Sequence, residues 1–120
     1  MLICFIPGNV PSSKNNKQWT GKYLIHSKTT KNYIAETTFY YQQYRQVFLD
    51  AIADLEKPFS VGLLFVRGSR HRFDYINACQ IVADLMVKHD WLEDDNADIL
   101  NPYFLPYRFD KENPGVEIYV

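Results

Sequence analysis

The run Phe59–Val66, which reads FSVGLLFV, constrains the fold more than any other stretch of this chain. Apart from Ser60, every residue in it is apolar or glycine, and it shows no alternation of polar and apolar side chains. Such a run predicts a strand that is buried on both faces. A strand of this kind needs neighbouring strands and a covering layer, so we expect a sheet with helices packed on it.

The segments around this strand predict two helices and further strands in the order ββαβαββ, with a polar, turn-forming loop over 9–20. We expect strands at Leu2–Ile6, Lys22–His26 and Val116–Val120, and helices from about Thr30 to Ala53 and from about Asp74 to Lys88. The segment Ile99–Tyr107 contains two prolines, which suits an edge strand or an irregular connection. The apolar positions of the helices are Tyr33, Ile34, Phe39, Tyr40, Tyr44, Val47, Phe48 and Ile52 in the first, and Ala78, Ile81, Val82, Leu85 and Met86 in the second. The chain is therefore expected to form one α+β domain over residues 1–120, with a mixed sheet of four to five strands and two main helices.

Composition sets the class of protein but does not reveal a partner. The chain has 120 residues and a net charge of −1, although residues 1–45 carry +5 and the remainder carries −6. Cys4 and Cys79 lie far apart and form no CxxC pair, which fits a reducing, cytoplasmic setting. The apolar opening MLICFI is too short for a signal peptide or a membrane span, so no membrane association is expected.

Charge is concentrated between Arg67 and Asp98, on both sides of the second predicted helix. A basic cluster precedes the helix and an acidic turn follows it; the cluster contains Arg67, Arg70, His71 and Arg72, and the turn contains Glu93, Asp94, Asp95 and Asn96. If the helix folds back across the sheet, the acidic turn can approach the start of the helix. Carboxylates gather divalent cations and arginines gather phosphates, so this pattern indicates metal-assisted chemistry on nucleic acid.

A magnesium site needs only one or two carboxylates, with waters and substrate oxygens completing the shell. We expect Asp74 and Asp94 as the metal ligands, with Asp95 beside them and Asn77 bonded to a ligand carboxylate or a metal-bound water. These four residues are the candidate catalytic set. Simpler explanations exist, because Asp74 is also a good helix N-cap and the acidic residues also suit an ordinary turn.

Phosphate binding is expected from the arginines and from lysines in the N-terminal polar region. The candidate DNA-binding residues are Arg67, Arg70, Arg72, Lys14, Lys17 and Lys22. Taken alone, the lysine-containing loop is better explained as a solvated loop. The histidines have no ligand spacing for zinc, and we find no glycine-rich phosphate loop or Ser/His/Asp arrangement.

At these residues the sequence resembles the RusA family of Holliday-junction resolvases. The resemblance rests on PSSKNN, GKYLIHSKTTKNY, RHRFDYIN, Asp84 and WLEDD, which follow the family's order and cover the chain from Pro11 to about Asp98. It implies cleavage of branched DNA by a two-fold dimer that uses Mg²⁺ or Mn²⁺ and no organic cofactor. By this resemblance Asp74 matches the first catalytic aspartate, Asp94 the late one, and Asn77 the family's asparagine.

Two positions depart from the family pattern. Ile76 stands where the family has its second aspartate, and Gln80 stands where it has a lysine. Asp95 or Glu93 can compensate for the missing carboxylate. Otherwise the chain binds branched DNA without cutting it well, or it is a protein-interaction domain whose acidic turn meets a partner.

Overall fold

A computed structural model describes residues 1–12, 17–19 and 24–120 of the chain, with backbone alone at 17–19 and 24–26. The helices are α1 (Lys28–Ile52) and α2 (Tyr75–Lys88). The strands are β1 (Leu2–Pro7), β2 (Lys17–Trp19), β3 (Leu24–His26), β4 (Phe59–Arg67), β5 (Leu100–Phe104), β6 (Arg108–Phe109) and β7 (Gly115–Tyr119).

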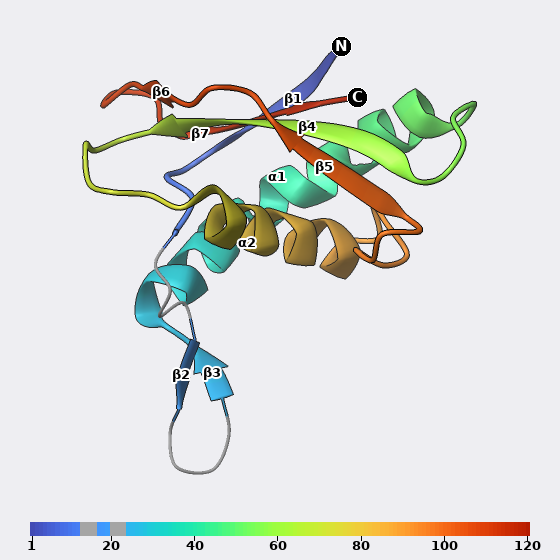
Figure 1. Ribbon diagram of the computed structural model, residues 1–120. Helices are drawn as coiled ribbons and strands as arrows, with labels where there is room; N and C mark the ends of the chain where they lie inside the picture. Colours follow the sequence, from blue (N-terminus) through green and yellow to red (C-terminus); the bar gives the residue numbers. More distant parts are fainter. Residues whose placement is uncertain (13–16, 20–23) are drawn as a thin grey trace.

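Five strands form one mixed sheet, as the sequence predicts. The order is β1-β7-β4-β5, and β6 pairs with β4 beyond the end of β5. Strand β4 is parallel to β5 and β6 and antiparallel to β7, which is itself antiparallel to β1. Both helices lie against one face of this sheet (Figure 1). The expected α+β architecture, with a mixed sheet and two main helices, is therefore confirmed.

The predicted helix boundaries hold within two residues, whereas β5 covers only part of the segment Ile99–Tyr107. The start of the strand expected at Lys22–His26 lies outside the described residues. The structure also adds two strands. Helix α1 begins after Ser27, whose side-chain oxygen accepts a hydrogen bond from the backbone N–H of Thr30 at 3.3 Å. The segment expected to be loop over 9–20 contains β2, which pairs antiparallel with β3 and extends away from the main sheet (Figure 1). The second addition is β6, a two-residue strand that becomes a strand only by pairing with the end of β4.

The core fills the space between the sheet and the helices. Strand β4 is buried at every position except Ser60, and the five apolar positions expected on α2 are all buried. On α1 the expectation was partly wrong, because Phe39 and Val47 are exposed while Thr37 and Tyr41 occupy buried positions. The helix carries aromatic residues on more than one side, so periodicity alone did not identify the buried face.

Candidate functional site

Asp74 is the N-cap of α2. Its Oδ1 accepts hydrogen bonds from the backbone N–H of Ile76 at 2.9 Å and of Asn77 at 3.4 Å. A carboxylate is favourable there because it satisfies otherwise unpaired N–H groups and faces the positive end of the helix dipole. The structure thus gives Asp74 a structural role, and both of its bonds use the same oxygen.

The acidic turn is held in place by Trp91. Helix α2 ends at Lys88, the chain reverses at Asp90 with a φ of 62°, and the backbone N–H of Trp91 donates to the carbonyl of Met86 at 2.8 Å. The indole N–H of Trp91 donates to the carbonyl of Tyr41 on α1 at 2.7 Å. This buried side chain therefore fixes the start of the turn against both helices.

Asp94 points its carboxylate into its own turn. One oxygen accepts from the backbone N–H of Asp95 at 2.7 Å and the other from the amide of Asn96 at 3.0 Å. The hydrogen bond from the Asp95 N–H, aided by that from Asn96, holds the pKa of the Asp94 carboxyl below its usual value. Its neighbour Glu93 forms an ion pair with Lys57. Both side chains are thus engaged away from α2.

Asp95 is the residue of the turn that contacts α2. The side-chain amide of Gln80 donates to Asp95 Oδ2 at 3.3 Å and to Asp84 Oδ1 at 2.7 Å. The two carboxylate oxygens therefore lie around a single nitrogen atom. Asp84 was noted in the sequence but was not among the expected site residues; its signal was the i, i+4 spacing from Gln80.

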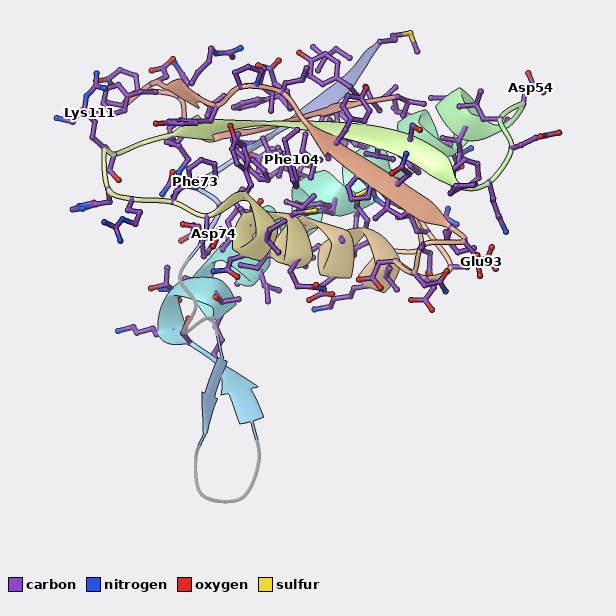
Figure 2. The ribbon with its side chains drawn as sticks, in the orientation of Figure 1. Asp54, Phe73, Asp74, Glu93, Phe104 and Lys111 are labelled. Carbon is purple, nitrogen blue, oxygen red and sulfur yellow. The ribbon has the colours of Figure 1, made fainter. Side chains whose placement is uncertain are left out.

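The expected pairing of Asp74 with Asp94 is not among the contacts of the described residues. Helix α2 has 14 residues and is roughly 21 Å long, with Asp74 before its first residue and the acidic turn beyond its last. Figure 2 shows Asp74 and Glu93 at opposite ends of this helix. The turn comes back along α2 as far as Gln80, so the carboxylates that meet are Asp84 and Asp95.

Asn77 connects α2 to the loop that follows β1. Its side-chain amide donates to the carbonyl of Ser12 at 3.1 Å. In the same region the side chain of Asn9 accepts from the backbone N–H of Gly68 at 2.9 Å. The loop after β1 therefore lies beside the N-terminal end of α2, and Asn77 orients this loop rather than a carboxylate of the acidic turn.

The three arginines have different environments. Arg67 is only 5% exposed, donates to the carbonyl of Val10 and lies with its guanidinium 4.6 Å from the ring centre of Phe73. Burial lowers the pKa of Arg67, and this side chain lies beneath the surface, where a DNA phosphate does not reach it. Arg70 and Arg72 are exposed and remain available for phosphate contacts.

The lysines are described less fully. Lys14 and Lys22 lie outside the described residues, and of Lys17 only the backbone, in β2, is described. Nearer to Asp84, a groove of about 450 Å³ runs between α1 and α2. Its lining includes Asp84 together with Lys31 and Lys88. Two lysine side chains therefore share this groove with Asp84, one of the two carboxylates bonded to Gln80.

No protein-family model matches this chain, and no curated protein matches it either. Within the described ranges no helix is long and apolar enough to cross a membrane. The same part of the chain contains no group of three or more histidine, cysteine, aspartate or glutamate side chains arranged to hold a metal ion. A metal held by these described side chains would have at most two of them as ligands, with waters or substrate oxygens completing its shell.

Proposed function

We propose that this chain is a divalent-metal-dependent endonuclease that cuts branched DNA, such as a Holliday junction, and that it acts as a homodimer. One observation carries the proposal: the amide of Gln80 joins Asp84 of α2 to Asp95 of the acidic turn on the surface of the domain. The exposed Arg70 and Arg72, which precede the same helix, support it because they suit DNA phosphates. The resemblance to RusA resolvases gives the substrate and the two-fold symmetry.

The donor set fits a magnesium or manganese ion. Asp84 and Asp95 would hold it, and when bound the ion would polarise the phosphoryl oxygen and lower the pKa of an attacking water. Gln80 orients both carboxylates through its N–H group and brings no positive charge, unlike the lysine of the family. Its amide therefore keeps the two acids together without neutralising them.

Three Asp→Asn variants test this assignment by cleavage of a labelled four-way junction with magnesium. Asp84→Asn and Asp95→Asn should each lower the cleavage rate by about 100-fold, since each removes a ligand charge. Asp94→Asn is the matched control from the same turn, because its carboxylate is bonded to Asp95 N–H and Asn96 instead. It should retain activity within a few-fold of the unaltered protein.

Junction binding measured in calcium separates chemistry from affinity. All three variants should still bind, with an affinity that falls steeply as salt rises. Unchanged cleavage by both Asp84→Asn and Asp95→Asn would exclude this carboxylate pair. Loss of cleavage in Asp94→Asn alone would restore the assignment that the family pattern implies.

A second candidate, binding of branched DNA without efficient cleavage, is favoured by Ile76. This side chain is 68% exposed in the first turn of α2, where the resemblance expects an aspartate. An aspartate fits there because the position is solvated and lies at the positive end of the helix. Ile76→Asp should therefore fold normally and raise cleavage if a carboxylate is missing. Rapid junction cleavage by the unaltered protein would exclude this candidate.

A further inference from the structure

An aromatic cluster lies at the end of the sheet where β4 leads into α2. Phe65 is buried at its base, and Phe73, Tyr75 and Phe104 pack around it, the last two with stacked rings 5.0 Å apart. Figure 2 shows Phe73 and Phe104 above the start of α2, close to Asp74. The cluster thus connects the core to the surface beside the arginine-containing loop.

Two aromatic side chains that follow this cluster in the chain are partly exposed. Tyr107 is 54% exposed and Phe109 is 39% exposed, although both belong to a segment that is firmly attached. The backbone N–H of Tyr107 donates to the hydroxyl of Tyr75 at 3.1 Å, and Asp110 N–H donates to the carbonyl of Arg67 at 2.9 Å. Fixed backbone with exposed rings is an arrangement that can receive a flat ligand without reordering the chain.

Both exposed rings face the loop between β4 and α2. The Tyr107 ring packs against Phe73, with ring centres 5.1 Å apart, and the Arg70 guanidinium lies 4.0 Å from the ring centre of Phe109. The intervening Arg108 points elsewhere and pairs with Glu117. The surface therefore combines a tyrosine ring with a stacked arginine–phenylalanine pair.

Of the charges around this surface, the cations are less engaged than the acids. The two loops contribute Arg70, Arg72 and Lys111, together with His71, against the acids Asp74, Asp110 and Glu112. The Asp74 carboxylate caps α2, where it accepts the backbone N–H groups of Ile76 and Asn77. The Asp110 carboxylate is occupied within its own turn, where it accepts the backbone N–H groups of Glu112 at 3.0 Å and Asn113 at 3.2 Å. Aromatic rings beside a guanidinium group suit a chain of flat bases joined by phosphates.

We propose that Tyr107, Phe109 and Arg70 form a stacking surface for the unpaired bases of single-stranded nucleic acid. This inference rests on the proposed function for its biological substrate. It deepens that function by naming the part of the DNA that this surface binds, the unpaired bases at a branch point. Stacking is indifferent to base identity, since every base presents a π face. Binding at this surface is therefore tolerant of sequence.

The test is fluorescence anisotropy with a labelled oligothymidine and with a fully paired duplex of the same length, in calcium. Tyr107→Ala and Phe109→Ala should each weaken binding of the single strand about 5-fold or more, with a much smaller effect on the duplex. Tyr107→Phe keeps the ring and should bind as the unaltered protein does. Arg70→Lys keeps the charge but loses the planar group, so it should weaken single-strand binding more than duplex binding.

Tyr103→Ala is the matched control. This tyrosine is 42% exposed, and its ring lies over Gly62 of β4, at the edge strand β5 instead of in the aromatic cluster. It should leave single-strand binding unchanged. Thermal melts of every variant show whether the fold is retained. The comparison of single-strand affinity that depends least on folding is that between Tyr107→Phe and Tyr107→Ala.

The two proposals fail separately. Absence of junction cleavage together with the single-strand losses at Tyr107 and Phe109 would overturn the nuclease and leave the stacking surface standing. Equal single-strand binding by Tyr107→Ala, Phe109→Ala and the unaltered protein would overturn the stacking surface, whatever the cleavage result. If Tyr107→Ala or Phe109→Ala converts the protein from dimer to monomer in sedimentation while its nucleic-acid binding is unaltered, the stacking surface is also overturned. The rings would then be assigned to a protein interface.

Discussion

Trp91 offers the sharpest test of how the fold positions the acidic turn, and Trp91→Phe is the informative change. The side chain is 2% exposed, packs against Phe48 with ring centres 5.1 Å apart, and donates its indole N–H to the carbonyl of Tyr41. Phenylalanine keeps an aromatic ring in the site but removes the donor and part of the volume. The hydrogen bond from the Trp91 side chain to α1 is lost with the donor.

The cost has two parts. A buried hydrogen bond contributes about 1 kcal/mol net, and here the cost stays near that value because the Tyr41 carbonyl lies within a helix and retains its helical partner. The cavity left by the smaller ring adds about 1–2 kcal/mol, less than the 3–5 kcal/mol of a full truncation to alanine. We therefore expect a loss of about 2–3 kcal/mol in the free energy of unfolding. For a domain of this size that lowers Tm by roughly 8–12 °C.

Urea unfolding followed by far-UV circular dichroism measures this loss directly. The midpoint should fall while the m-value stays constant, since the surface exposed on unfolding is nearly the same. Phe39→Ala is the control, because that aromatic side chain on α1 is 66% exposed and its removal should cost no more than about 0.5 kcal/mol. A Trp91→Phe variant as stable as this control would show that the Trp91 contact does not hold the turn.

Two further predictions concern the core. Gly115→Ala should destabilise the protein by about 1–3 kcal/mol in the same urea assay, because its new Cβ would lie 2.5 Å from the backbone oxygen of Ile6. Gly68→Ala is the control: the closest contact of its new Cβ would be 3.2 Å, so it should cost clearly less, and equal costs would refute the steric argument. Burial raises the pKa of Cys4 to about 12 and that of Cys79 to about 11. Neither thiol should therefore react with a disulfide reagent at pH 8 until urea unfolds the chain. Rapid labelling of the folded protein would contradict this.

Local chemistry was sufficient for the two helices and the central strand. The unbroken apolar run at Phe59–Val66 identified β4, and the spacing of Ala78, Ile81 and Val82 identified the buried face of α2. Ser27 and Asp74 are caps because each side-chain oxygen accepts from backbone N–H groups within three residues. Such contacts depend on neighbours in sequence, which is why the residues alone predict them.

The candidate site depended on contacts that no local pattern encodes. Asp94 and Asp95 are adjacent acids, yet Asp95 meets Gln80 of α2 while Asp94 turns into its own loop, close in sequence to Trp91, which is bonded to α1. Arg67 and Arg70 are three residues apart, yet β4 buries the first.

The aromatic cluster shows the same division most clearly. Phe73 and Tyr107 are 34 positions apart, and their rings meet because β6 pairs with the end of β4, which no pattern in the sequence predicted. The sequence by itself determined the helices and the central strand, since propensity, capping and periodicity act over a few residues, and the order of these elements predicted a mixed sheet. The tertiary structure alone decided which acids, arginines and rings share a surface, because that choice depends on packing between segments far apart in the chain.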